Sequence, residues 1–522
     1  MNTHYDGIIL GAGHNSLVLQ AYLCRAGLDV VCLERSETVG GGLRTEDHNG
    51  FLHNTHSFYH RALTSAPWYT DLELERRGAH YIEPELNVVL LTRDGRALEW
   101  WTDFEKTVVS FAHFSRRDAE RLRYWRDAFR PIVEKILIPE AQSPPLSPQE
   151  RTKKLSASPE GRLLLETSQL SPQQFALREF EHPLIQAGLL FFNGLREVDL
   201  RAPGFGHHIP ALLASKGKAQ MCVGGSAQLA RALLSAVEEE GGRVLTNTAP
   251  KRIIIEGDRA VGVETEHGDV LHARHFVASG LNPQQTFLDL MDEEVLPAAW
   301  RRKVKAFRYN VLAPLFGVYA NLGERPTYTA EKDYPHVNKG LMMIMGLDGA
   351  ARFDEIVRSH EEGLVPPTVM WGSCPTLFDA TQAPAGQHAA FMWEKLPYKL
   401  RGDAQNWDAE AQAHGHRMLE VWSEHAPNMR DAVLETFVRS PLDVERTLPN
   451  MRYGDLLVGS LGHGQVGYNR PFAGAGHYRA HLRNLYLCGS CCHPSGNITG
   501  FPGYNCAQVL VADLDLEPII AS

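Results

Sequence analysis

The first sixty residues constrain the fold of this 522-residue chain more than any other stretch. An apolar run from Gly7 to Leu10 leads into Gly11-Ala12-Gly13, with Ser16 at the third position of a GxGxxG-like fingerprint. A helical pattern follows, and then an apolar, strand-like run over residues 29–33 that ends at Glu34. This order of strand, glycine turn, helix, strand and acidic residue is typical of a unit that holds an adenine dinucleotide.

Each residue of the fingerprint has a physical role. Gly11 permits the tight turn, and Gly13 lets the main chain approach a pyrophosphate at the positive end of the following helix. Ser16 replaces the usual third glycine but is small enough for close packing of helix and strand. Glu34, about 20 residues further on, can accept hydrogen bonds from a ribose. A βαβ unit without a ligand is the less favoured alternative, because every part occurs in order.

Composition narrows the class of protein. The length predicts two or three domains, and 43% hydrophobic with 22% charged residues is typical of a globular enzyme. The net charge of −10 argues against a nucleic-acid partner. No apolar run approaches the length of a membrane helix, and Met1 leads almost directly into the first strand, so we expect a cytoplasmic protein without a signal peptide. The eight cysteines are expected to be reduced, because they are scattered and several lie in apolar, strand-like contexts. Cys488, Cys491 and Cys492 lack the spacing of a zinc site and are interpreted as structural.

The chain predicts two domains, the first of them discontinuous. Residues 1–110, 215–285 and 478–522 carry the nucleotide-binding patterns, including a hairpin that pairs 252–256 with 260–265. Residues 111–214 and 286–477 form the second, substrate-binding domain, in which the apolar spacing of 111–137 predicts a helix. The Pro- and Ser-rich stretch 139–172 is interpreted as a surface excursion or mobile lid, and as a candidate surface for a partner or for peripheral membrane contact.

Three motifs, in order, resemble those of the FAD-dependent phytoene-desaturase-like superfamily. They are GAGHNSLVLQAYLCRAGLDVVCLER followed by VGGGLRTE, then VGGSAQLARAL, and finally LYLCGSCCHPSGNITGFPGYNCA. The resemblance implies an α/β fold: a discontinuous, Rossmann-type, glutathione-reductase-like FAD-binding domain and a mixed α+β substrate domain. It also implies FAD rather than NAD as the cofactor. The chain departs from the superfamily's HPGGG and PGRN elements at Ser495, Asn497 and Tyr504.

The same resemblance implies the residues of the FAD site. The glycine turn would hold the pyrophosphate, Glu34 the adenosine ribose, and the C-terminal motif the ribityl chain and the isoalloxazine ring. The expected FAD-binding residues are Gly11, Gly13, His14, Asn15, Ser16, Glu34, Arg35, Gly41, Gly42, Leu43, Arg44, Pro250, Gly489, Ser490, Gly500, Pro502, Gly503, Tyr504 and Asn505.

Histidines gather in HNTHSFYH, which contains His53, His56 and His60, and another lies at His493. We take His56, His493 and Tyr504 as candidate catalytic residues, because their motifs lie near the flavin ring in the superfamily. The alternative is that each histidine is exposed or is a hydrogen-bonded core residue. We expect no metal, because no carboxylate or cysteine accompanies the histidines at a matching spacing.

These features predict an FAD-dependent oxidoreductase that transfers hydride from a substrate C–H bond to flavin N5. Its partners would be a small-molecule substrate and an electron acceptor, oxygen or another. The many histidines suggest a small to medium substrate with polar groups. Three alternatives stay open: a redox-neutral isomerase or hydratase that uses the flavin, a carotenoid-type desaturase or ketolase, and a flavin-binding scaffold with little turnover.

Overall fold

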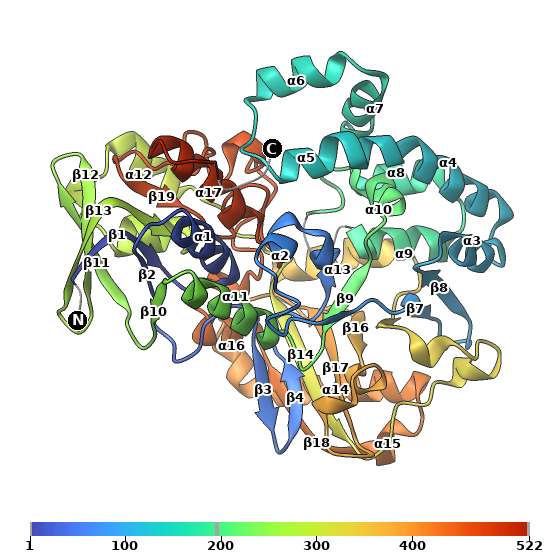
Figure 1. Cartoon of the computed structure of the whole chain (residues 1–522). Helices are drawn as coiled ribbons and strands as arrows, with labels where there is room; N and C mark the ends of the chain where they lie inside the picture. Colours follow the sequence, from blue (N-terminus) through green and yellow to red (C-terminus); the bar gives the residue numbers. More distant parts are fainter. Residues whose placement is uncertain (1–2, 194–197, 519–522) are drawn as a thin grey trace.

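The computed structural model describes residues 3–193 and 198–518 and contains two large sheets (Figure 1). The first sheet has the strand order β10-β2-β1-β13-β12-β11, and β19 pairs with β13. Its core from β10 through β13 to β19 is parallel, whereas β11, β12 and β13 form an antiparallel meander. The strands are β1 His4–Leu10, β2 Val30–Leu33, β10 Arg243–Leu245, β11 Pro250–Glu256, β12 Arg259–Thr265, β13 Val270–Ser279 and β19 Leu485–Leu487.

Helices bury the parallel core of this sheet. Helix α1 (His14–Arg25) contacts both α11 (Ala227–Glu239) and α17 (Phe501–Asp513), and eleven of its twelve residues are buried. Strand β2 is buried at all four positions, as expected for a parallel strand covered on both faces. This is the Rossmann-type arrangement that the sequence predicts, and the β11–β12 hairpin is confirmed.

The second sheet has the order β18-β14-β17-β16-β15-β7-β8 and separates two apolar clusters. Alternation along β17 sends Phe391 and Trp393 into the cluster beneath the helical layer and Met392 into the cluster beneath α14 (Asn406–His425). The strands are β7 Leu86–Leu91, β8 Ala97–Trp101, β14 Leu315–Leu322, β15 Met342–Met345, β16 Met370–Ser373, β17 His388–Lys395 and β18 Val433–Arg439.

Strands β7 and β8 lie in this second sheet, although the sequence patterns placed residues 1–110 with the nucleotide unit. β7 pairs in parallel with β15, so a segment from the N-terminal part of the chain joins strands from residues 342–345. The apolar run of β7 is compatible with either sheet, and only long-range pairing assigns it.

The helical layer contains the segment 139–172, which is folded into helices instead of an irregular loop. Three of its four Ser-Pro pairs start a helix: Ser147, Ser158 and Ser171 accept hydrogen bonds from main-chain N–H groups of α6, α7 and α8, and the proline follows at the first helical position. Helices α6 and α7 stand at the outer edge of the molecule (Figure 1). The helices are α3 Phe104–Ala112, α4 Arg116–Ile132, α5 Ile138–Ala141, α6 Pro148–Ser156, α7 Pro159–Ser168, α8 Pro172–Glu179, α9 Pro183–Asn193 and α10 His208–Ala214.

The predicted helix over 111–137 is interrupted once. Helix α3 ends at Ala112, and Ser115 caps α4 by accepting a hydrogen bond from Asp118 N. A π-helical turn at Val133–Leu137 then joins α4 to α5.

Smaller elements connect the two sheets. A hairpin of β3 and β4 precedes the segment of His56, and β9 pairs with β5 and β6. No helix in the described ranges combines the length and apolar character needed to cross a membrane. The remaining elements are β3 Thr45–His48, β4 Phe51–Asn54, β5 His60–Arg61, β6 Tyr81–Ile82, β9 Ala219–Cys222, α2 Pro67–Asp71, α12 Ala298–Lys305, α13 Ala351–Glu362, α15 Met429–Ala432 and α16 Pro441–Thr447.

Candidate functional site

A two-part cavity runs past the start of α1 and reaches the second sheet. One part, the Glu34 half, is lined by the ends of β1 and β2 and by the chain around residues 249–250. The other part, the His56 half, is lined by the start of α1, by β14 and β17, and by the loop after β19. The two halves share Gly13, Gly41, Gly280, Leu448 and Asn450, so they meet at the glycine turn. The two halves together have the shape expected for an extended ligand that lies across the start of a helix.

The glycine turn is built as the fingerprint requires. Gly11 has φ +82° and its N–H donates to Leu33 O at 2.8 Å, which ties the turn to β2. A Cβ placed on Gly13 would meet no atom within 4 Å, so the main chain faces open space there. Helix α1 begins at the next residue, and its first N–H groups are directed to the point where the halves meet. An anionic group can therefore bind at this point.

Glu34 is held rigidly at the wall of its half. Its two carboxylate oxygens accept hydrogen bonds from Ala12 N and Ser36 N, each at 2.8 Å, and the residue is only 8% exposed. Each oxygen keeps a lone pair that can accept from a hydroxyl of a ligand. Arg35, Arg44 and Pro250 line the same half, as the sequence predicts.

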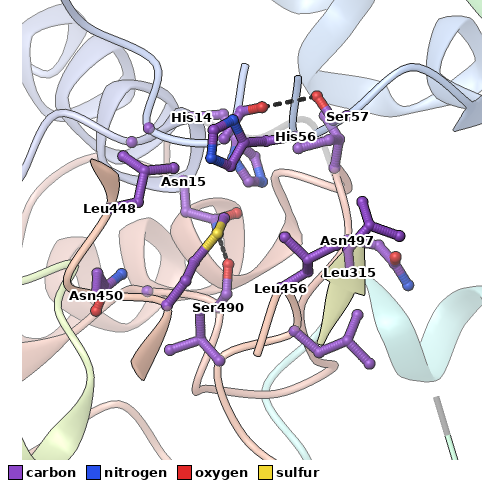
Figure 2. A pocket seen from close by; sticks show the side chains of 18 of the residues that line it. His14, Asn15, His56, Ser57, Leu315, Leu448, Asn450, Leu456, Ser490 and Asn497 are labelled. Atoms are coloured by element: carbon purple, nitrogen blue, oxygen red, sulfur yellow. Dashed lines mark hydrogen bonds between the residues drawn. The ribbon is translucent and has the colours of Figure 1, made fainter. Parts of the chain in front are cut away.

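The wall of the His56 half combines polar and apolar side chains. His14, Asn15, His56 and Ser57 lie near the start of α1, whereas Asn450, Ser490 and Asn497 lie around the rest of the wall with Leu315 and Leu456 (Figure 2). Asn15 Nδ2 donates to Ser490 Oγ at 3.1 Å. The apolar lining residues are Phe58, Leu315, Trp393, Leu448, Met451, Leu456, Leu457, Val458 and Ile498.

Three buried atoms in this wall have no hydrogen-bond partner among the described residues: His14 Nε2, Asn15 Oδ1 and His56 Nε2. Burial lowers the pKa of His14 and of His56 to about 4, so both rings are neutral near pH 7. Buried polar atoms are normally satisfied, so three in one wall indicate a site that can offer hydrogen bonds to a polar ligand.

The other two histidines of HNTHSFYH lie outside the lining. His53 Nε2 is 2.7 Å from Asn321 Oδ1, and His60 Nδ1 is 2.7 Å from Tyr81 Oη. Burial lowers the pKa of His53 to about 4 and that of His60 to about 3. Both are hydrogen-bonded core residues. The described ranges contain no group of three or more His, Cys, Asp or Glu side chains arranged to hold a metal ion.

Most of the predicted cofactor residues line the cavity. They come from the turn, from the end of β2, from the VGGGLRTE element and from the loop after β19. They are Gly11, Gly13, His14, Asn15, Ser16, Glu34, Arg35, Gly41, Gly42, Arg44, Pro250, Gly489 and Ser490.

The remaining predicted residues, which include two of the catalytic candidates, do not line either half. Cβ atoms on Gly500 and Gly503 would meet Trp68 and the main chain of Asn15, so both glycines serve packing. Asn505 Nδ2 donates to Ala141 O at 3.0 Å, and His493 Nε2 donates to Glu140 O at 2.8 Å, so both hold α5. The residues outside the lining are Leu43, His493, Gly500, Pro502, Gly503, Tyr504 and Asn505.

Sequence reasoning missed the part of the wall that the second domain supplies. Trp393 and Lys395 project from β17, and Lys395 Nζ donates to Ala313 O. The aromatic residues around Trp393 are visible in the sequence, but their alternation also fits an ordinary core strand. Leu448–Asn450 and Leu456–Val458 lie in irregular segments, for which the sequence has no periodic signal.

The fold and the site together define a two-domain dinucleotide-binding flavoprotein. The residues fit FAD, because one half offers a rigid carboxylate for a ribose, the junction offers helix N–H groups for a pyrophosphate, and the other half offers unpartnered polar atoms beside an apolar wall.

The chain belongs to the family of flavin-containing amine oxidoreductases, whose model matches residues 21–326. It is therefore an FAD-dependent oxidoreductase, with a small-molecule substrate and an electron acceptor.

Relatives cover nearly the whole chain. One of the subunits of limonene dehydrogenase from Castellaniella defragrans is 30% identical over 98% of this chain and 95% of its own length. Pyridine nucleotide-disulfide oxidoreductase domain-containing protein 2 of Rattus norvegicus is 26% identical over 98% and 94%. Phytoene desaturases are also among the relatives, which confirms the resemblance seen in the motifs. Putrescine oxidase bound to putrescine shares the fold, with 14% identity over 98% of this chain and 99% of that one and a TM-score of 0.60.

Proposed function

We propose that the protein is a dehydrogenase or desaturase that oxidises a C–H bond of a mainly apolar substrate. The observation that supports this proposal is the set of nine apolar side chains that line the His56 half together with its polar side chains. Such a wall favours a hydrocarbon-like ligand, because buried polar groups of a ligand need matching partners. We therefore propose a mainly apolar substrate in place of the polar one that the histidines suggested. The name of the limonene dehydrogenase relative, which refers to a hydrocarbon, is in line with this proposal.

FAD bound across the two halves supplies an acceptor for two electrons and a proton in the form of hydride. Asn15 and Ser490 would hold the flavin end, while Gly13 and the start of α1 would hold the pyrophosphate. Phe58, Trp393 and Leu456 exclude water from the reacting bond and position the substrate by contact.

His56 is the group we propose to accept the proton that leaves the substrate when a double bond forms. Its ring is neutral near pH 7, and its Nε2 is a buried atom of the cavity wall without a partner among the described residues. His493 and Tyr504 have no contact with the cavity, so we assign them no role in the chemistry. The electrons then pass to oxygen or another acceptor.

The test is anaerobic mixing of the FAD-loaded protein with candidate substrates while the visible flavin band is recorded. We expect cyclic or linear hydrocarbons with allylic C–H bonds to bleach the band, and short-chain primary amines to leave it unchanged. Bleaching by amines alone would overturn the proposed substrate class. Conversion of a substrate without acceptor and without bleaching would instead support the redox-neutral alternative.

A further inference from the structure

The hydroxyl group of Thr55 joins His56 to a carboxylate. Thr55 Oγ1 is 2.9 Å from Glu46 Oε1 and 3.0 Å from His56 Nδ1. All three residues lie in or next to the β3–β4 hairpin: Glu46 is in β3, and Thr55 and His56 follow β4 directly. The contacts form a chain that runs from a partly exposed carboxylate to the wall of the His56 half.

Glu46 is ionised, and this fixes the direction of the first hydrogen bond. Burial alone would raise its pKa, but Arg439 Nη2 at 2.8 Å and the Thr55 hydroxyl hold the pKa of Glu46 below its ordinary value. A carboxylate has no proton to donate. The single proton of the Thr55 hydroxyl therefore points to Glu46 Oε1.

The second hydrogen bond then has only one direction. Because the Thr55 proton is already donated, Thr55 Oγ1 can only accept from His56, so Nδ1 carries the proton of the neutral ring. The other nitrogen, Nε2, consequently has a free lone pair. This is the buried atom that has no partner among the described residues, and His56 itself lines the cavity.

We propose that Glu46 and Thr55 are positioning residues that hold His56 in its Nδ1–H tautomer and present the Nε2 lone pair to the cavity. The inference rests on the proposed role of His56 as the proton acceptor. When Nε2 takes the proton of the substrate, the ring becomes a cation that keeps Nδ1–H donated to Thr55. The Glu46 carboxylate two hydrogen bonds away favours that charge, whereas Arg44 and Arg439 oppose it, and no further proton moves.

The tautomer can be measured without turnover. FAD-loaded protein labelled with ¹⁵N in its histidines is studied by NMR, and the His56 signals are identified by their loss in His56→Gln. In the unsubstituted protein we expect a protonated Nδ1 and an unprotonated Nε2. Thr55→Val removes the acceptor and should move the proton to Nε2 or average the two forms. Glu46→Gln frees the Thr55 proton to face Nδ1 and should also place the ring proton on Nε2.

Two variants serve as controls. Thr55→Ser keeps the hydroxyl and should retain the pattern of the unsubstituted protein. Thr107→Val removes another fully buried threonine hydroxyl, bonded to Trp101 O in the second domain, and should leave the His56 signals unchanged. A ring proton on Nε2 of the unsubstituted protein, or an unchanged His56 pattern in Thr55→Val, would overturn the inference.

A kinetic readout separates this inference from the proposed function. With a reducing substrate, Thr55→Val should slow flavin reduction roughly tenfold with little change in KM, because binding contacts are kept while the acceptor is misaligned. Thr55→Ser should restore the rate. If the tautomer is as expected but no apolar substrate reduces the flavin, the proposed function fails while the positioning chain stands.

Discussion

Gly503 lies so close to Asn15 that a Cβ on the glycine would be 1.9 Å from the Asn15 carbonyl oxygen. This contact sets the approach of α17 to α1, and α1 begins at the glycine turn of the cavity. Gly503, which belongs to the C-terminal motif, therefore influences the position of the site through the packing of α17 on α1. It makes no contact with the cavity itself.

Gly503→Ala should lower the free energy of unfolding by at least about 2 kcal/mol, because main-chain atoms of a helix cannot move aside as a flexible side chain can. Urea denaturation of the FAD-free protein measures the change. A loss below about 0.5 kcal/mol would show that the two helices separate easily, and would contradict the packing role.

In contrast to Gly503→Ala, Gly13→Ala should leave the stability of the fold nearly unchanged and weaken the binding of FAD. Gly13 has φ −69°, which alanine adopts without strain, and its Cβ would meet no protein atom. The fold should keep its stability within about 0.5 kcal/mol. The added methyl group would occupy the place where we expect the pyrophosphate, so FAD affinity should fall by at least about tenfold, as measured by equilibrium titration of the apoprotein. Unchanged affinity would show that the cofactor does not bind at this turn.

The contrast between Gly13 and Gly503 shows which features of the site can be predicted from the sequence and which cannot. Local patterns predict the strand–turn–helix unit, Glu34 and the β11–β12 hairpin, because each depends on residues close in the chain. The C-terminal motif also indicates that a glycine is needed at position 503. It does not report whether the need is space for a ligand or space for another helix, and only the packing of α17 on α1 decides between them.

The second domain was harder to predict for the same reason. Ser-Pro pairs are frequent in loops and at helix starts alike, so α6 to α8 could not be told from an irregular excursion. The apolar wall of the cavity is assembled from β17 and from loops distant in sequence, such as Leu448 and Leu456. The apolar character of the site therefore became visible only in three dimensions.

Buried histidines should make the protein sensitive to mild acid. The pKa of His60 is lowered to about 3 in the folded state against about 6.5 when unfolded, so below about pH 6.5 the unfolded chain binds more protons. This contribution to stability is complete above about pH 6.5 and is lost as the pH falls toward 3. Between about pH 7.5 and 5.5 each such histidine should remove about 1 kcal/mol.

His60→Gln should reduce that pH dependence by about 1 kcal/mol, whatever the variant's stability at neutral pH. The measurement is the free energy of unfolding from urea titrations at the two pH values. The exposed His416 is the matched control, and His416→Gln should keep the slope of the unsubstituted protein. Equal slopes in all three proteins would show that the pKa of His60 is the same in the folded and the unfolded state.

The last prediction concerns Arg470, whose guanidinium group is completely buried beneath the loop after β19. Nη2 donates to Ser490 O at 3.0 Å, Nε donates to Cys492 O at 3.2 Å, and Nη1 donates to Ser460 O at 3.0 Å. The group therefore ties the loop that carries Gly489 and Ser490 to the loop at residues 459–465.

Arg470→Lys keeps the charge but cannot reach several carbonyl groups at once, so we expect a loss of at least about 3 kcal/mol in stability and weaker FAD binding. Urea denaturation and FAD titration measure the two effects. Arg479→Lys is the control, because Arg479 forms a half-exposed pair with Asp513 in the same region and should change stability by less than about 1 kcal/mol. If Arg470→Lys loses stability but binds FAD as tightly as the unsubstituted protein, the loop does not depend on Arg470 for its position at the cavity.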